Sequence, residues 1–289
     1  MELLERITGD GFHLSFEVFP PKQATSMANI SRATHEIAHL HPAFMSVTYG
    51  AAGGSRDFTL ELSRQIQEEC GIPALAHLTC VHATREEILR HLRTMESLGL
   101  RNVMVLRGDR VAGGSDEKEW GYRHASELVR EVRALYPGMC IGGACYPEVH
   151  PESSCQKEDL MHLREKVDLG CQFLTTQMFF DNSLLYAFLF RLREAGITVP
   201  VLPGVMPITS RTQVQKARDL SHAFLPRSFL ALVDQFGSND RAMCQAGIAY
   251  ATEQIIDLFA NGIHCVHVYT MNRPDVASAI CRNLSSILS

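Results

Sequence analysis

The chain has 289 residues, of which 46% are hydrophobic and 20% charged, and its formal net charge is −5. The acidic balance weighs against a nucleic-acid partner, because binding to phosphate backbones needs a basic surface. No uninterrupted apolar segment approaches the ~20 residues of a membrane helix, and residues 1–6 lack the cationic start of a signal peptide, so we expect a cytoplasmic protein without membrane contact.

Eight short apolar runs alternate along the chain with stretches of helical periodicity. Several runs are almost continuously hydrophobic, which is typical of parallel strands that are covered on both faces. Eight strands, each followed by helical sequence, predict an α/β fold of the (β/α)8 TIM-barrel type, in a single domain over residues 1–289. The predicted strands are 13–20, 44–50, 73–80, 102–109, 140–147, 173–180, 200–207 and 264–271.

Glycines and polar residues mark the ends of the predicted helices. Thr84 and Glu87 predict a capping box at the start of the helix after the third strand. The segments 212–220 and 240–260 predict an extra helix or helices between the seventh and eighth strands. Glycine readily adopts the left-handed conformation that follows many helices. The glycines predicted to end helices in this way are Gly71, Gly99, Gly170, Gly196 and Gly262.

Glu17 interrupts the first apolar run just before Pro20 and Pro21. An ionised carboxylate in a buried strand costs several kcal/mol unless it is paired, so we expect the pKa of Glu17 to be raised. A carboxyl group that keeps its proton near neutral pH is suited to general acid catalysis. A carboxylate satisfied by a neighbouring arginine or backbone group accounts for the strand equally well.

Polar residues are dense at the carboxyl ends of the predicted strands, where the active sites of barrels are built. This density predicts an enzyme. Gly50 and Gly108 let the backbone approach a ligand closely, and Arg107 and Lys166 are suited to a phosphate group. The polar strand ends carry Glu17, Thr48, Tyr49, His77, Thr79, Arg107, Asp109, Tyr146, His150, Thr176, Gln177, Tyr269 and Arg273.

Known cofactor and metal motifs are absent from the sequence. There is neither a P-loop nor a Rossmann glycine motif. His77 and His150 are candidate zinc ligands, but no H-E-x-x-H motif or carboxylate cluster accompanies them, so no metal is predicted. Nine cysteines without a C-x-x-C pair are typical of reduced thiols.

Six segments, in order, resemble the flavin-dependent 5,10-methylenetetrahydrofolate reductases. The similarity extends from about residue 12 to residue 281, and each segment alone is a weak signal, whereas six in sequence are specific. The chain is similar to the short bacterial type, because no sequence that would form a regulatory domain follows the predicted barrel. The segments are residues 16–22, 46–50, 77–80, 106–109, 146–151 and 269–273.

The resemblance implies a reaction. FAD would lie at the strand ends, where NADH or NADPH reduces it, and methylenetetrahydrofolate would then take the hydride and become 5-methyltetrahydrofolate for methionine synthesis. Glu17 matches the family's acid, which opens the methylene bridge, and Asp109 matches a catalytic aspartate near the flavin and the pterin. A strand-end aspartate that caps a loop is the alternative for Asp109.

The resemblance also implies binding residues for folate and for FAD. Gln177, Gln213 and Arg273 match folate contacts, although Gln213 has the alternative of closing a helix start and Arg273 that of pairing with Asp275. The positions implied for FAD are Thr48, Tyr49, Ala51, His77, Arg107, Gly108, Asp109, Ala125, Tyr146, His150, Asp159 and Lys166. An exposed helix face is the alternative for the last two.

The chain departs from the family at two positions. His124 stands where a tyrosine is common, and Ala217 where related bacterial enzymes have an aromatic lid residue. These departures concern adenosine packing and specificity, and leave the acid unchanged. The family further implies a homo-oligomer, dimer or tetramer; an iron–sulfur electron donor and the choice between NADH and NADPH stay open.

Two rival functions remain. A flavin barrel similar to proline dehydrogenase would share the FAD site but oxidise an amino acid, and a binding module would hold folate or flavin without turnover. Glu17 discriminates between the reductase and the first rival, because amine oxidation has no need of a carboxylic acid on the first strand.

Overall fold

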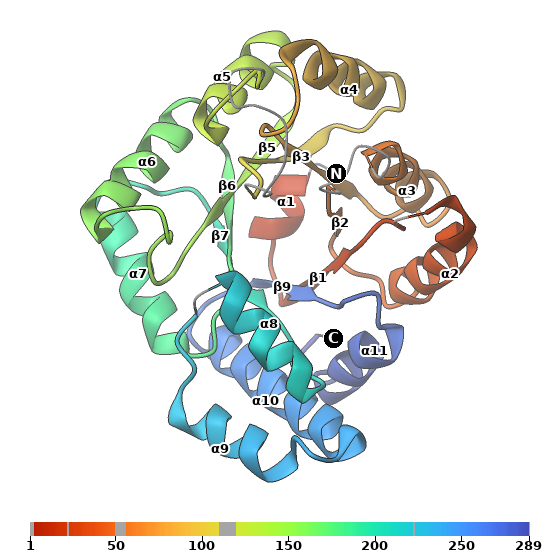
Figure 1. Ribbon diagram of the computed structural model, residues 1–289, viewed down its shortest axis with the longest axis vertical. Helices are drawn as coiled ribbons and strands as arrows, with labels where there is room; N and C mark the ends of the chain where they lie inside the picture. The colour runs from red at the N-terminus through yellow and green to blue at the C-terminus, as the bar shows by residue number, and fades with distance from the viewer. Residues whose placement is uncertain (1–2, 22, 50–55, 110–119, 222, 289) are drawn as a thin grey trace.

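The computed structural model describes residues 3–21, 23–49, 56–109, 120–221 and 223–288. Its strands form one sheet, in the order β7-β6-β5-β4-β3-β2-β1-β9-β8, in which every pairing is parallel. Figure 1 shows this sheet curved into a ring with helices around it. The predicted (β/α)8 TIM barrel is confirmed.

Each strand lies inside one of the eight predicted runs. The strands are shorter than the runs, because the polar residues at the carboxyl end of most runs leave the sheet. The strands are β1 (His13–Val18), β2 (Met45–Val47), β3 (Ala74–Thr79), β4 (Asn102–Leu106), β5 (Cys140–Cys145), β6 (Phe173–Thr176), β7 (Val201–Leu202), β8 (Gly204–Val205) and β9 (Cys265–Tyr269).

The seventh predicted run forms two short strands on either side of Pro203. Proline has no backbone N–H to donate and interrupts the ladder. Val201 and Leu202 pair with β6, whereas Gly204 and Val205 pair with β9. The segment therefore joins both edges of the sheet, and this is how the barrel closes.

A helix follows each of the strands β1 to β6, and α11 follows β9. Three helices, α8, α9 and α10, lie between β8 and β9. The sequence predicted α8 as 212–220 and α10 as 240–260, but did not predict α9. The short helix α1, at the start of the chain, was not predicted either. The helices are α1 (Leu3–Thr8), α2 (Met27–Ala38), α3 (Arg56–Glu68), α4 (Arg85–Ser97), α5 (Ala125–Leu135), α6 (Gln156–Asp168), α7 (Asn182–Glu194), α8 (Arg211–Ser221), α9 (Arg227–Phe236), α10 (Asp240–Ala260) and α11 (Pro274–Asn283), with a 3-10 turn at Ala24–Ser26.

The predicted helix ends are confirmed. All five glycines expected after helices have φ between +66° and +118°, the region that side chains other than glycine rarely adopt. Thr84 and Glu87 form the predicted capping box at the start of α4. These signals were readable because a helix end is a local structure.

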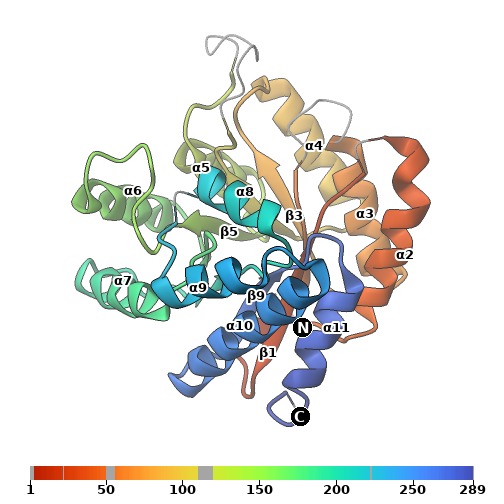
Figure 2. The same cartoon turned by 60° about the horizontal axis from the view of Figure 1, so that its bottom comes forward.

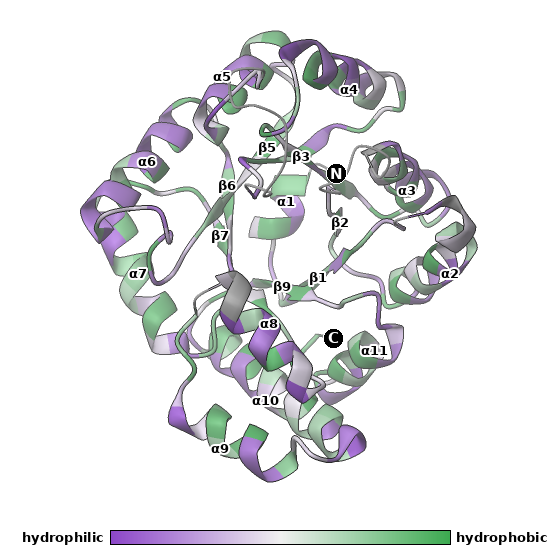
Figure 3. Ribbon diagram, viewed as in Figure 1, coloured by the Kyte–Doolittle hydropathy of each residue, from purple (hydrophilic) through white to green (hydrophobic). Residues whose placement is uncertain are grey.

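Helices α8, α9 and α10 lie together on the side of the barrel near β8 and β9 (Figures 1 and 2). Phe229 of α9 and Met243 of α10 are buried there with Phe180 and Ile208. Apolar and polar residues alternate around the outer helices (Figure 3), as amphipathic helices on a barrel require. Among the described residues, no helix is both long enough and apolar enough to cross a membrane.

The amino-terminal end of the barrel interior is apolar. Leu3 and Ile7 of α1 are buried against Phe44, Leu75 and Phe173, which stand before or at the start of their strands. Figure 1 shows α1 inside the ring of strands. This cluster plugs the bottom of the barrel, so the space available to a ligand is at the other end.

Candidate active site

Glu17 is the penultimate residue of strand β1 and points into the barrel. It is nearly inaccessible to solvent, with 7% of the residue exposed. Phe16 and Val18 on either side belong to the outer core, because successive residues of a strand face opposite ways. Burial raises the pKa of Glu17 to about 8, and a hydrogen bond from Ser46 offsets part of the shift. The raised pKa expected from the sequence is therefore confirmed, and the carboxyl group is mostly protonated at pH 7.

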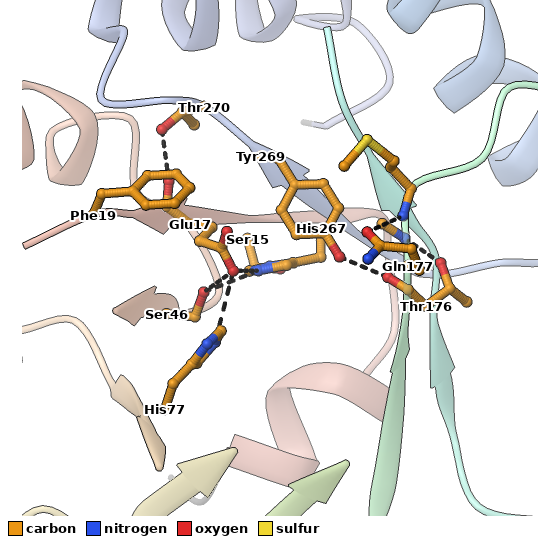
Figure 4. Close-up of polar contacts among 12 residues, drawn as sticks. Ser15, Glu17, Phe19, Ser46, His77, Thr176, Gln177, His267, Tyr269 and Thr270 are labelled. Atoms are coloured by element: carbon orange, nitrogen blue, oxygen red, sulfur yellow. Dashed lines mark hydrogen bonds and ion pairs between the residues drawn. The ribbon is translucent and has the colours of Figure 1, made fainter. Parts of the chain in front are cut away.

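Neutral side chains surround the carboxyl group of Glu17. Its Oε2 atom lies 3.5 Å from Oγ of Ser46, 3.6 Å from Nε2 of His77 and 4.0 Å from Nε2 of His267 (Figure 4). Burial lowers the pKa of His77 to about 4 and that of His267 to about 3, so both rings are uncharged at pH 7. Within the described ranges, these two uncharged rings are the only basic side chains within 4.0 Å of the Glu17 carboxyl group. The alternative in which a neighbouring arginine pairs with Glu17 is therefore not found among the described residues.

The backbone around Glu17 is held by the loop that follows β9. Thr270 donates a hydrogen bond of 2.7 Å to the carbonyl oxygen of Glu17. The side-chain amide of Asn272 accepts from the N–H of Phe19 at 2.8 Å and donates to its carbonyl at 2.9 Å. Met271 and Asn272 have φ of 53° and 55°, a left-handed conformation that asparagine tolerates better than most residues. The first and last strands are thus tied together at the site.

Tyr269 lines the interior beside this group. Its hydroxyl donates to the carbonyl oxygen of Thr176 at 2.6 Å, and burial, followed by the charge of Glu17, raises its pKa well above the usual value (Figure 4). A Cβ at Gly204 would lie 2.4 Å from the Tyr269 hydroxyl, so only glycine permits this approach. Gln177 stands next to Thr176, and its Oε1 accepts from the N–H of Met178 at 2.9 Å.

A second polar group lies at the ends of β4 and β5 and on α6. Arg107 donates two hydrogen bonds to the carboxylate of Glu152. The Tyr146 and His150 rings meet edge to face with centroids 4.6 Å apart. The pKa of Tyr146 is raised by burial and then by the charge of Asp109, and lowered by contacts with Arg107 and Gln177. This group therefore reaches from Gln177 to the end of β4.

Asp159 and Lys166 of α6 turn toward the barrel rather than to solvent. Asp159 is buried, its carboxylate accepts from the N–H of His150 at 3.4 Å, and burial raises its pKa. Lys166 is half-buried and its Nζ donates to the carbonyl oxygen of Ala144 at 2.8 Å. The exposed-face alternative is therefore wrong for Asp159, and Lys166 points its charge at the end of β5.

Other predicted cofactor positions line the same rim. Gly108 has φ of +89°, and a Cβ there would lie 3.0 Å from Thr79 and Val81. Thr48 donates its N–H to the carbonyl oxygen of Val18 at 3.1 Å, and Tyr49 meets His91 edge to face at 6.1 Å.

The remaining cofactor positions are less informative. Asp109 is exposed, and its carbonyl oxygen contacts Nε2 of His82 at 3.2 Å. Ala125 is the first residue of α5. Gly50 and Ala51 lie outside the described residues.

The predicted folate contacts Gln213 and Arg273 are engaged within their own segments. Oε1 of Gln213 accepts from the N–H of Thr209 at 2.7 Å and closes the start of α8. Arg273 pairs with Asp275 at 2.8 and 2.6 Å. The structure therefore contains the local alternatives foreseen for both residues. Ala217 is buried in the cluster beneath α8.

The sequence did not single out Ser15 and His267, nor assign a role to Ser46, although all three lie next to Glu17. Oγ of Ser15 is 2.8 Å from Nδ1 of His267, and Nε2 of that ring is 3.0 Å from Oγ of Ser46. A signal for them existed: Ser15 and Glu17, like His267 and Tyr269, are polar residues two positions apart in otherwise apolar strands, which places each pair on one face.

The described residues contain no group of three or more His, Cys, Asp or Glu side chains arranged to hold a metal ion. What the site does contain is one protonated carboxyl group among neutral histidines, and a separate set of charged residues on the rim. The first can supply a proton in a place from which water is largely excluded. The second can bind an anionic ligand.

Residues 3–285 match the family described as methylenetetrahydrofolate reductase. The chain is 34% identical to the Escherichia coli K12 5,10-methylenetetrahydrofolate reductase and 35% to that of Salmonella typhimurium, with 94% of this chain and 90% of each relative covered. It is also 34% identical to the maize methylenetetrahydrofolate reductase (NADH) 1, but spans only 51% of that protein and about half of the similar Arabidopsis thaliana protein.

Solved structures share the fold. A Clostridium thermocellum protein, described as binding two copies of 5-methyl-5,6,7,8-tetrahydrofolic acid, superposes with a TM-score of 0.68 at 14% identity, covering 97% of this chain and 98% of that one. The dihydropteroate synthase of Xanthomonas albilineans gives a TM-score of 0.52 at 15% identity, covering 96% and 92%. At these identities the likeness concerns the barrel alone.

Proposed function

This chain belongs to the methylenetetrahydrofolate reductase family, and from that premise we propose that it reduces 5,10-methylenetetrahydrofolate to 5-methyltetrahydrofolate, with NADH or NADPH as the reductant and FAD as the intermediate carrier. The observation that carries the proposal is Glu17, a buried carboxyl group with a pKa of about 8 at the ligand end of the barrel. No other reaction considered for this barrel requires a proton donor at that position.

The chemical role of Glu17 follows from the substrate. Opening the methylene bridge of the folate breaks one carbon–nitrogen bond, whose electron pair goes to the departing nitrogen. Glu17 gives that nitrogen its proton, and the methylene carbon, left as an electrophilic iminium, takes a hydride to become a methyl group. The burial that raises the pKa of Glu17 keeps the proton available at pH 7, as a general acid requires.

Three features of the site support a flavin. The Nε2 atom of His77 is buried and has no hydrogen-bond partner within the described residues, so it is available to a polar ligand. Gly108, with φ of +89° and a Cβ position only 3.0 Å from Thr79 and Val81, has no side chain to keep a ligand away from the backbone. Arg107 and Lys166 lie on the same rim, where Arg107 would exchange its partner Glu152 for a diphosphate. When bound, FAD supplies reversible two-electron chemistry, so that hydride is held between the two halves of a ping-pong cycle.

We assign residues to FAD, to the pterin and to the nicotinamide. FAD would be held by the side chains and backbone of Thr48, Tyr49, Ala51, His77, Arg107, Gly108, Asp109, Ala125, Tyr146, His150, Asp159 and Lys166. Gln177 would contact the pterin and, in the other half-reaction, the nicotinamide. Asp109 would hydrogen-bond the pterin and disfavour an anionic reduced flavin.

Gln213 and Arg273 would bind the folate beyond its pterin. Arg273 suits a carboxylate of the glutamate tail, and it would exchange its present partner Asp275 for that carboxylate. Gln213 would likewise release Thr209. Both exchanges replace one hydrogen bond by another, so they carry a small net cost.

The test begins with the visible spectrum of the purified protein. We expect the absorption of an oxidised flavin, its loss when NADH or NADPH is added without oxygen, and its return when methylenetetrahydrofolate follows. A colourless protein that does not take up added FAD would overturn the proposal. Bleaching by proline would indicate the amino-acid oxidase, and binding without any bleaching would indicate the carrier. Light scattering of the same sample tests the expected dimer or tetramer.

A further inference from the structure

Four polar side chains form a line inside the barrel, from Ser15 through His267 and Ser46 to Glu17 (Figure 4). The links are 2.8 Å from Ser15 to Nδ1 of the ring, 3.0 Å from Nε2 to Ser46, and 3.5 Å from Ser46 to Oε2 of Glu17. The strand register builds the line, because Ser15 is paired with His267 and Glu17 with Ser46. Oγ of Ser15 also lies 3.4 Å from the carbonyl oxygen of Val266.

Counting protons shows that the line has one consistent arrangement when Glu17 is ionised. Each serine hydroxyl and the neutral imidazole has a single proton to donate. The carboxylate needs a donor, so Ser46 gives its proton to Glu17 and must itself accept one. His267 then carries its proton on Nε2, and its bare Nδ1 accepts from Ser15.

The arrangement reverses when Glu17 is protonated. The carboxyl group donates to Ser46, which turns its own proton to Nε2 of the ring. His267 then carries its proton on Nδ1 and donates it to Ser15, whose proton goes to the carbonyl oxygen of Val266. Every donor again has an acceptor. The two arrangements differ in the proton of Glu17, in the orientations of two serine hydroxyls and in the tautomer of one ring, with no change in the charge of that ring.

We propose that Ser15, His267 and Ser46 are positioning residues that act through Glu17, and that at equilibrium the ionisation state of Glu17 determines which nitrogen of His267 carries the ring proton. The proposal rests on the proposed function, in which Glu17 gives its proton to folate and is left as a buried carboxylate. An unsatisfied buried charge is costly. This line of four side chains, which we call the relay, supplies the new carboxylate with a hydroxyl donor without bringing a second charge into the barrel.

The titratable groups around Glu17 keep the same protonation state over the pH range in which Glu17 titrates. His77 on β3 and His267 on β9 are neutral, since burial lowers their pKa values to about 4 and about 3. Tyr269, also on β9, keeps its proton because burial raises its pKa. From β2 the hydroxyl of Ser46 contacts the carboxyl group. His77, at 3.6 Å, is the one rival acceptor for the Glu17 proton in the described site.

Nitrogen NMR of the holoenzyme labelled at histidine tests the relay directly. Between about pH 6 and about pH 10 we expect the proton of His267 to move from Nδ1 to Nε2, with a midpoint near the pKa of Glu17. His267→Asn identifies the signals of this ring among the 13 histidines. In Glu17→Gln the exchange should vanish, because the amide does not titrate. A ring that keeps one tautomer throughout, or that still exchanges in Glu17→Gln, overturns the proposal.

Kinetics of Ser46→Ala provide the second test. Loss of the donor should slow reoxidation of the reduced enzyme by methylenetetrahydrofolate roughly 10- to 100-fold, the worth of a hydrogen bond to a charged group, and shift its pH profile upward. Reduction by NADH or NADPH should be unchanged. The matched control is Ser63→Ala, which removes another fully buried hydroxyl, one that donates to Thr59 of its own helix at 2.7 Å. Equal slowing of both half-reactions, or the same effect in the control, contradicts the relay.

The two tests separate the relay from the proposed function. If the wild-type protein does not reduce methylenetetrahydrofolate, the proposed function fails, while the tautomer exchange is still measured by NMR. If folate is reduced but the His267 ring does not exchange, only the relay fails.

Discussion

The two ends of the barrel interior are built from the same strands and have opposite chemistry. Along β3 the inward positions change from Leu75 to His77, and along β9 from Cys265 to His267. The amino-terminal residues pack against α1 and fill space, whereas the carboxyl-terminal ones hold protons. A step of two residues, about 7 Å along a strand, therefore separates the part that stabilises the barrel from the part that acts on a ligand.

The largest expected effect comes from the polar end. Glu17→Gln keeps the shape of the side chain but removes the acid, so methyl formation should fall by about 10²- to 10⁴-fold, the usual contribution of general acid catalysis. Reduction of the flavin by NADH or NADPH should be preserved, because that half-reaction needs no acid at this position. Stopped-flow measurement of the two half-reactions checks the outcome. Full activity of the variant would remove Glu17 from the mechanism.

A matched change at the apolar end should affect stability alone. Phe173→Ala removes a fully buried ring that lies over Gly142, where even one added Cβ would come within 2.4 Å of it. We expect the free energy of unfolding to fall by about 3–5 kcal/mol. Urea titration measures the loss, and the rate per folded molecule should be unchanged. A change in the pH profile of the variant would show that the two ends are coupled.

The dependence of stability on pH sharpens the comparison. Glu17 has a pKa of about 8 in the folded protein and 4.5 as its reference value, so between these values the folded state binds more protons than the unfolded state. Stability should therefore fall as pH rises from about 4.5 to about 8, with a slope of up to about 1.4 kcal/mol per pH unit. His77 and His267 have lowered pKa values and act in the opposite direction below about pH 6.5. The contribution of Glu17 is isolated by subtracting the free energy of unfolding of Glu17→Gln from that of the wild type at each pH. An equal pH dependence in the two proteins would contradict this prediction.

The smallest effect is expected at the rim of the polar end. Arg273 and Asp275 form an exposed pair, so Arg273→Ala should change stability by less than about 1 kcal/mol. If Arg273 binds the folate tail, its loss should raise KM for methylenetetrahydrofolate roughly tenfold and leave kcat unchanged. Asp275→Asn is the control, because it frees the arginine and should lower KM or leave it unaltered. An unchanged KM in Arg273→Ala would assign this residue to the local pair alone.

Short-range rules accounted for much of the fold. The eight apolar runs, the five left-handed glycines and the Thr84–Glu87 capping box each depend on residues within one turn or one strand. The division of the seventh run into β7 and β8 at Pro203 depended instead on the two strands with which its halves pair, β6 and β9. The position of α1 likewise depends on the apolar end of the barrel that it fills.

The sequence by itself determined the barrel, its strands and the unusual placement of Glu17, because hydrophobic periodicity and the cost of a buried charge are written in neighbouring residues. Only the tertiary structure decided what surrounds that carboxyl group. Ser15 and His267 are 252 positions apart and meet through strand register, and the buried Asp159 of α6 meets the backbone of His150 after β5. Proton-sharing contacts of this kind depend on which side chains face one another across the barrel, and that is a property of the closed sheet.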